Sequence, residues 1–329
     1  MKRNIYILFF SILCLIRLIH ADGNLGQSGL NFLQIPVEPR GSAVGGAAVS
    51  VSDGAAAIYW NPAGMLIDSK FDFNFSQTNW FFDTKLSYIG AVYQMGSNNA
   101  FGVSFTSFYM DDMEITTVFE PDGTNQFYSS GDMAGGLSYA RRMTDRFSFG
   151  ITAKYAYEYI WNESTGQLAI DIGSVYKTDF LNLRLGMVIR NIGAKIDSLN
   201  GEDVNDRINE ELARNQEDNP RIERLTPGIR LPQVFQMGIA FEPIAHLTTL
   251  IDIVVPADNE ESLIIGGEYS FSDLASIRAA YIINNDVTRF SLGGGININI
   301  SGFSSSVSYA FTGNRYLTNV HQFGINFRL

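Results

Sequence analysis

The feature that most constrains the fold is an alternation of apolar and polar residues that recurs along most of the chain. Between positions 147 and 161 every odd position is apolar or aromatic: Phe147, Phe149, Ile151, Ala153, Tyr155, Tyr157, Tyr159 and Trp161. Most even positions in the same stretch are small or polar. A period of two residues belongs to a β-strand with two unlike faces. The sequence therefore predicts an all-β protein, although one such strand would also fit a soluble β-sandwich.

The number and order of the alternating runs favour a membrane barrel over a sandwich. Fourteen runs are predicted near 71–80, 85–95, 100–110, 131–143, 146–161, 166–177, 181–191, 233–243, 247–255, 262–271, 275–283, 288–300, 303–313 and 319–329. Connections after even-numbered runs are tight, whereas the long ones, 111–130 and 192–232, follow odd-numbered runs. Short turns at one end and long loops at the other are typical of transmembrane β-barrels, with the turns in the periplasm. We therefore expect a transmembrane antiparallel β-barrel of about 14 strands with both termini periplasmic.

The last predicted strand reaches the carboxyl terminus. Phe323, Ile325, Phe327 and Leu329 alternate there with Gly or polar residues. A barrel needs such a strand to pair with the first one, because an open edge in lipid would leave backbone groups without partners. This ending also resembles the C-terminal signal by which outer-membrane barrels are recognised for assembly.

The first 21 residues have the pattern of a secretory signal peptide: Lys2 and Arg3, an apolar stretch over 5–19, and Ala21. They contain three of the 23 Lys and Arg residues and none of the 34 acidic ones, so the net charge of −11 becomes −14 after cleavage. They also contain Cys14, the one cysteine of the chain. Disulfides, cysteine nucleophiles and Cys/His zinc sites are therefore not expected. The acidic balance disfavours binding to nucleic acid.

Residues 22–70 lack long alternation and are rich in small residues. Ten of the seventeen residues from position 41 to 57 are Gly or Ala. A barrel of about 14 strands is too wide for wall side chains alone to fill, and small residues allow close backbone packing. We therefore expect an N-terminal luminal hatch, which divides the chain into a signal peptide (1–21), a hatch or plug (22–70) and a transmembrane β-barrel (71–329). The spacing Gly41, Gly45 and Gly46 is no dinucleotide fingerprint, because no strand–helix unit surrounds it.

The segment 41–64 resembles the hatch signature of FadL-like outer-membrane proteins and, more closely, the PorV/PorQ family. The positions that carry the resemblance are Gly41, Gly45, Gly46, Asp53, Trp60, Asn61, Pro62, Ala63 and Gly64. Stretches within 231–240, 252–269 and 309–323 look like the same family. The resemblance implies an outer-membrane protein of a Gram-negative-type bacterium. It also implies a carrier or scaffold in type IX-like protein secretion, whose partners are secreted cargo proteins and attachment components. The wider FadL-like relatives instead transport hydrophobic small molecules, which leaves a hydrophobic ligand as the alternative.

Charged residues on the predicted inward faces are balanced in sign. They are Lys154, Glu158, Asp171, Arg184, Arg190, Asp252, Glu268 and Arg278. Four of each sign favour a paired network around the hatch over an ion pathway, so a lumen plugged at rest is expected.

The remaining candidates concern the loops. Val204, Ile208 and Leu212 recur every four residues in the charged loop 201–230, which predicts a short amphipathic helix and a candidate partner contact. Aromatic residues are expected to cluster at the rim: Trp80, Phe81, Phe82, Phe108 and Tyr109. The acidic runs 111–112 and 258–261 lack the spacing of a calcium loop. His246 and His321 suggest no base beside a nucleophile. We expect no enzyme, no cofactor and no metal, and outer-membrane lipid as the surroundings.

Overall fold

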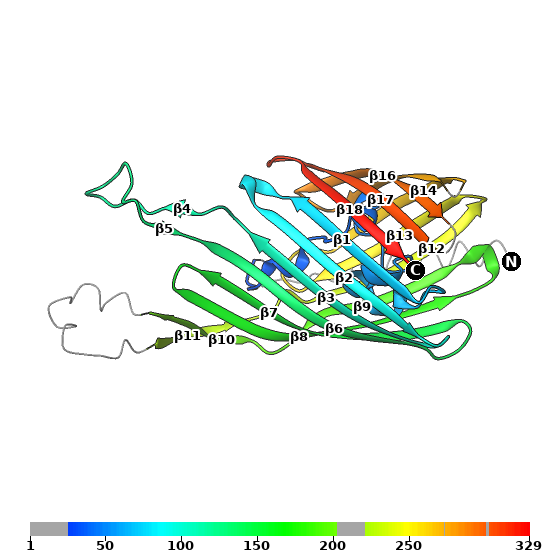
Figure 1. Cartoon of the computed structure of the whole chain (residues 1–329), viewed down its shortest axis with the longest axis horizontal. Coiled ribbons are helices and arrows are strands. Elements are labelled where there is room, and N and C mark those ends of the chain that lie inside the picture. The colour runs from blue at the N-terminus through cyan, green and yellow to red at the C-terminus, as the bar shows by residue number, and fades with distance from the viewer. Residues whose placement is uncertain (1–25, 203–220, 273, 301–302) are drawn as a thin grey trace.

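The computed structural model describes residues 26–202, 221–272, 274–300 and 303–329, and its main element is a closed antiparallel barrel (Figure 1). Each wall strand pairs with its neighbour, and β18 returns to pair with β1, so the described wall closes on itself. The fourteen wall strands are β1 (Phe71–Asn79), β2 (Lys85–Met95), β3 (Asn99–Tyr109), β6 (Ser130–Arg142), β7 (Phe147–Ile160), β8 (Glu163–Lys177), β9 (Arg184–Ile192), β12 (Val234–Ile244), β13 (Leu247–Pro256), β14 (Ser262–Phe271), β15 (Ala275–Ile283), β16 (Thr288–Ile300), β17 (Phe303–Asn314) and β18 (Val320–Arg328). The predicted all-β transmembrane barrel is confirmed.

The alternation in the sequence becomes an apolar outer surface and a mixed interior. On β1, the odd positions Phe71 and Phe73 are 48% and 39% exposed. The even positions Asp72 and Ser76 are buried. The same pattern runs along β7 from Phe147 to Ala156, where odd positions face out and even positions face in. An apolar outer band on a closed barrel is suited to lipid. Within the described residues, no helix is long and apolar enough to cross a membrane.

Two hairpins extend beyond the wall at one end of the molecule (left in Figure 1). They are formed by β4 (Met113–Glu114) with β5 (Phe127–Tyr128), and by β10 (Ile196–Glu202) with β11 (Arg221–Ile229). We call this the long-hairpin end. The opposite end, the tight-turn end, carries the short connections at 96–98, 143–146, 178–183 and 245–246, and the carboxyl terminus lies there (Figure 1).

The structure corrects two details of the predicted elements. The predicted strand at 181–191 begins later, at Arg184, because Phe180–Asn182 forms the 3-10 turn η6 in which Leu181 has a φ of 52°. Part of the predicted loop 192–230 is regular, because 196–202 and 221–229 pair as the β10–β11 hairpin. The predicted helix with Val204, Ile208 and Leu212 lies outside the described residues.

Residues 26–70, which we call the hatch, lie inside the barrel as short helical turns. These are η2 (Asn31–Gln34), α2 (Pro39–Ala43), η3 (Gly54–Ala56), α3 (Ala57–Trp60) and η4 (Pro62–Met65). Helix α2 begins where the Glu38 carboxylate accepts the backbone N–H groups of Arg40 and Gly41, both at 2.7 Å, with Pro39 in the first turn. The hatch also supplies much of the hydrophobic core, because Val44 and Trp60 pack with wall residues such as Leu250.

The described part of the hatch starts at the long-hairpin end. The Gly26 N–H donates to the carbonyl of Asp258 and the Gly29 N–H donates to that of Arg230, each at 3.0 Å. The predicted signal peptide and the location of the amino terminus fall on residues 1–25, outside the described ranges. The three-part division of the chain and the periplasmic placement of both termini therefore stay predictions.

Candidate functional site: the hatch and its cavities

Asn61 is the centre of the contact between hatch and wall. Its side chain is fully buried, and its Nδ2 donates to the carbonyls of Val49 at 2.8 Å and Ser174 at 3.0 Å. Its Oδ1 accepts the Ala63 N–H at 3.2 Å, which caps the turn that Pro62 begins. One side chain thus joins two parts of the hatch to strand β8. An asparagine followed by Pro and a small residue gives this turn without a strained backbone.

Glycines of the wall lie directly against this motif. A Cβ at Gly150 of β7 would overlap the backbone of Pro62, and one at Gly173 of β8 would overlap the Asn61 side chain. Within the hatch, a Cβ at Gly41 would overlap the Trp60 indole. Gly45 and Gly46 have φ values of 70° and 91°, a region that favours glycine. The predicted hatch motif is therefore a packing motif, whose small residues allow contact with the wall.

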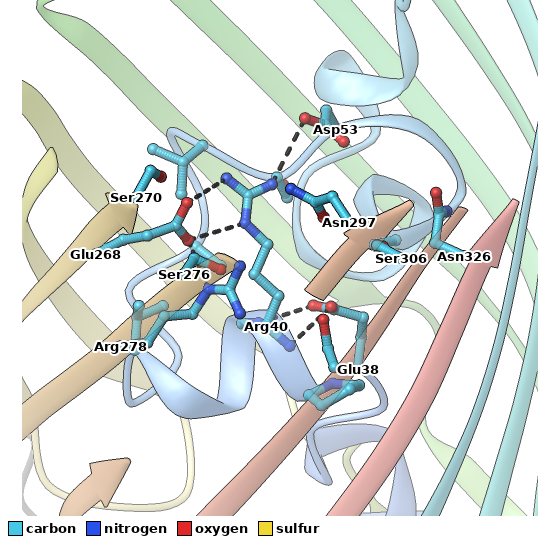
Figure 2. Close-up of a pocket in the computed structure, with 18 of the residues that line it drawn as sticks. Glu38, Arg40, Asp53, Glu268, Ser270, Ser276, Arg278, Asn297, Ser306 and Asn326 are labelled. Atoms are coloured by element: carbon cyan, nitrogen blue, oxygen red, sulfur yellow. Dashed lines mark hydrogen bonds and ion pairs between the residues drawn. The ribbon is translucent and has the colours of Figure 1, made fainter. Parts of the chain in front are cut away.

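A charged network links the hatch to the wall near the tight-turn end (Figure 2). The Arg40 guanidinium donates to Glu268 of β14 at 3.0 Å, and Arg278 of β15 donates to the same carboxylate at 2.6 Å. Arg328 of β18 donates to Asp53 at 2.8 Å and to the buried Asp72 of β1 at 2.7 Å. Charged side chains of the hatch therefore form ion pairs with charged side chains of the wall.

The electrostatics of Asp53 follow from this network. Arg40 lies 3.5 Å from the second oxygen of Asp53, opposite the oxygen that Arg328 contacts. Burial opposes ionisation of Asp53, but the two guanidinium groups outweigh it and hold its pKa below the ordinary value. Asp53 is therefore a carboxylate at neutral pH, and it completes the link between α2 and β18.

This network borders a polar cavity of about 550 Å³, the tight-turn cavity. Its lining is rich in hydroxyl and amide groups, which include Ser270, Ser276, Asn297, Ser306 and Asn326 (Figure 2). His246 and Ser272, from two tight turns, also line it. The cavity therefore opens toward the tight-turn end and is suited to water or a polar group, not to a hydrophobic ligand.

Two further cavities lie on the long-hairpin side of the hatch. One of about 600 Å³ has the rim residues Trp80 and Phe108 in its lining, with Asp132 and Glu158 opposite each other on β6 and β7. The other, of about 220 Å³, lies beside Arg190, and we call it the Arg190 cavity. Gln34, Pro36 and Trp80 line both cavities. Of the predicted rim cluster, Trp80 and Phe81 are in contact, with ring centroids 4.6 Å apart and ring planes tilted by 50°, while Phe82 is 83% exposed.

The structure brings together some of the eight predicted luminal charges and not others. Lys154 pairs with Asp171 at 2.7 Å, and Arg278 pairs with Glu268. Asp252 is fully buried and accepts a hydrogen bond from Gln236 Nε2 at 2.7 Å. Arg184 lies opposite Lys177 near the tight turns, and Glu158 lies opposite Asp132. The role of these residues stays a prediction.

The prediction missed Glu38, Arg40, Asp72 and Arg328. The sequence contains two signals that could have located these residues. Asp72 and Arg328 occupy the inward positions of the first and last strands, which closure brings together. Glu38-Pro39 has the composition of a helix start immediately before the hatch motif. Among the described residues, no group of three or more His, Cys, Asp or Glu side chains could hold a metal ion.

The closed barrel with an apolar outer band and a segment folded inside it has the architecture of an outer-membrane β-barrel protein. The family model described as type IX secretion system protein PorV matches residues 20–212. The chain therefore belongs to the PorV family.

Solved structures support the fold. The chain is similar to the toluene transporter TodX of Pseudomonas putida, with a TM-score of 0.56 and 12% identity over 85% of this chain and 94% of that one. It is also similar to a FadL homologue of Pseudomonas aeruginosa, with a TM-score of 0.57 and 13% identity over 88% and 96% of the two chains. The monoaromatic hydrocarbon channel CymD gives a TM-score of 0.57 and 13% identity, over 89% and 96%. At these identities the likeness concerns the fold alone. No curated protein matches the sequence.

Proposed function

We propose that this protein is a carrier or scaffold in type IX-like protein secretion, where it binds exported proteins or attachment components at the outer membrane. Membership of the PorV family supports this role. A hatch that packs against the wall through Asn61 and shares ion pairs with it supports a binding role over a permanently open channel. The proposal assigns the chain no catalytic activity.

The observation that carries the proposal is the apolar tip of the β4–β5 hairpin. Val118 and Phe119 are each 94% exposed, and they are the two central residues of a turn closed by reciprocal backbone bonds between Thr117 and Glu120, both at 3.2 Å. Turns of this kind usually carry Gly, Asn or Asp. A β-branched and an aromatic side chain at the tip of a projecting hairpin are suited to a protein partner.

The charge of the same hairpin specifies the partner further. Residues 110–130 contain five acidic residues and no Lys, Arg or His; the acids are Asp111, Asp112, Glu114, Glu120 and Asp122. An acidic hairpin with an apolar tip fits a partner surface that has an apolar pocket with a basic rim. Exported proteins or attachment components with such a surface are the expected partners.

The test is a double substitution, Val118→Ser with Phe119→Ser, followed by affinity purification from native membranes and mass spectrometry. Loss of a central aromatic contact is expected to lower recovery of exported proteins about tenfold or more. The matched control is Phe180→Ser, which removes an exposed phenylalanine at the tight-turn end and is expected to change nothing. Equal recovery from the double variant and the control would contradict the role of this tip.

A second candidate function, transport of a hydrophobic small molecule, is favoured by one feature of the wall. The last ladder pair of β8 with β9 is Ile170 with Ile192, and β8 next pairs with β10 at Ser164. Between them, the side chains of Thr165 and Gln167 reach the carbonyls of Ser198 and Lys195. This interruption of the backbone ladder would suit a lateral opening. Uptake of a hydrophobic dye into liposomes that contain the protein, absent from empty liposomes, would support this function over the first.

A further inference from the structure

Arg190 of β9 is buried in the lumen without a carboxylate partner. It is 7% exposed, and it forms no ion pair within the described part of the chain. Its Nη2 donates to Gln236 Oε1 at 3.3 Å, while Nε and Nη1 have no hydrogen-bond partner among the described residues. A buried guanidinium with two free donors is costly unless something else satisfies it.

Among the described residues, neither Asp171 nor Asp252 forms an ion pair with Arg190, although Asp252 Oδ1 itself accepts no hydrogen bond. Asp171 accepts Lys154 and the backbone N–H of Asn191, each at 2.7 Å. Asp252 is separated from Arg190 by Gln236, whose Nε2 donates to that carboxylate and to the carbonyl of Gly46. The Nε and Nη1 groups of Arg190 form no well-aligned hydrogen bond with the described residues, although the Tyr59 hydroxyl interacts with the guanidinium, so they remain available to a ligand.

The surroundings of Arg190 form a site with both polar and apolar walls. Its guanidinium lies 5.0 Å from the Tyr59 ring centroid and 5.8 Å from that of Trp60, so two hatch aromatics hold it by cation–π contact. The Arg190 cavity, of about 220 Å³, adjoins all three side chains. Ile264, Ile282 and Val254 add apolar surface to its lining. This volume is roughly that of seven waters.

We propose that Arg190 and the Arg190 cavity bind a small organic carboxylate. Its carboxylate accepts the free N–H groups of Arg190, and its aliphatic or aromatic body lies against Tyr59, Trp60 and Ile264. The carboxylate belongs either to a free small acid or to the C-terminus of a polypeptide that enters from the long-hairpin side. The cavity is too small for a long acyl chain. The site goes beyond the carrier role and does not depend on it.

The test measures binding to the full chain in a neutral detergent by isothermal titration calorimetry. Benzoate is the probe and benzamide its uncharged isostere. Because hydrogen bonds to a charged group are strong, benzoate is expected to bind roughly ten- to hundredfold more tightly than benzamide. Arg190→Gln removes this preference and Arg190→Lys keeps part of it. N-acetylphenylalanine and its amide form the second arm: tighter binding of this acid than of benzoate indicates a polypeptide C-terminus, and the reverse indicates a free acid.

A second variant separates binding from damage to the hatch. Ser262 lines the cavity at the start of β14, and Ser262→Phe fills the space while leaving Arg190 in place. It is expected to abolish binding of both acids without lowering the thermal stability of the barrel. Equal affinity for benzoate and benzamide in the unaltered protein would overturn the proposal. So would absence of benzoate binding, or benzoate binding that Arg190→Gln and Ser262→Phe leave unchanged.

Discussion

Glycines on the inner face of the wall allow the hatch to lie close to the barrel. Gly150 and Gly173 come from adjacent strands and meet the backbone of Pro62 and the side chain of Asn61. The hatch motif and these wall positions therefore act as one structural unit, although they are about a hundred residues apart. A side chain added at one of these wall glycines is therefore expected to displace the hatch as much as a substitution in the Asn61–Pro62 motif does.

Gly150→Val tests this fit. Its side chain would collide with backbone, so the free energy of unfolding is expected to fall by about 1–3 kcal/mol, the range for overpacking. Denaturant titration in detergent micelles measures the change. Gly135→Val is the matched control, because a Cβ at Gly135 of β6 meets no atom within 4 Å. An equal loss of stability in both variants would show that the effect comes from the strand and not from the hatch.

The elements of the wall could be predicted almost completely. Period-two alternation is a local property, so strands such as β2 and β15 are located to within a residue, and the even count follows from the turns. The β10–β11 hairpin could not be predicted in this way. The sequence of β10 does not alternate, and its Ile196 is buried in one cluster with Leu30 and Phe32 of the hatch.

Contacts between side chains in the lumen were harder to predict than the face of the strand on which each side chain lies. The inward positions of Lys154 and Asp171 follow from alternation, but their pairing depends on the register of β7 against β8. Arg40 and Glu268 are 228 residues apart and meet only because the hatch folds back into the barrel. A sequence pattern contains no information on such a distance, so the site could be predicted only as a set of candidates.

The loop that connects β10 and β11 allows a test at the scale of the element. Deletion of residues 201–224 is expected to leave the barrel folded, because the wall closes through β8, β9 and β12 without this loop. If the apolar positions Val204, Ile208 and Leu212 contact a partner, the deletion also lowers co-purification of exported proteins. Heat-dependent mobility on gels checks folding, and pull-down from native membranes checks association. Unchanged association would remove this segment from the proposed contact surface.

At the scale of the whole molecule, the near-zero mean hydropathy of 0.02 is an average of unlike surfaces. The outer band is apolar, the interior contains both polar and apolar residues, and the acidic hairpin 110–130 projects from one end. This division suits the wall to lipid contact, and under the proposed function the long-hairpin end contacts the partner. The hatch occupies part of the lumen and packs against the wall, with cavities on either side of it.

A plugged lumen has an electrical consequence. Purified protein in planar bilayers is expected to show no large constitutive conductance, because buried groups such as Trp60, Asn61 and Asp72 occupy the cross-section beside the network of ion pairs. Recordings at neutral pH measure this directly. A large, steady conductance that is independent of voltage would contradict a lumen plugged at rest.

The carrier role is tested most directly by what the protein holds in its own membrane. The unaltered protein is purified by affinity from native outer membranes in a mild neutral detergent, and bound material is identified by mass spectrometry of proteins and of small molecules in parallel. Exported proteins or attachment components are expected in stable proportion to the barrel. Recovery of lipid-like or other hydrophobic small molecules, with no exported protein, would contradict it and favour the transporter.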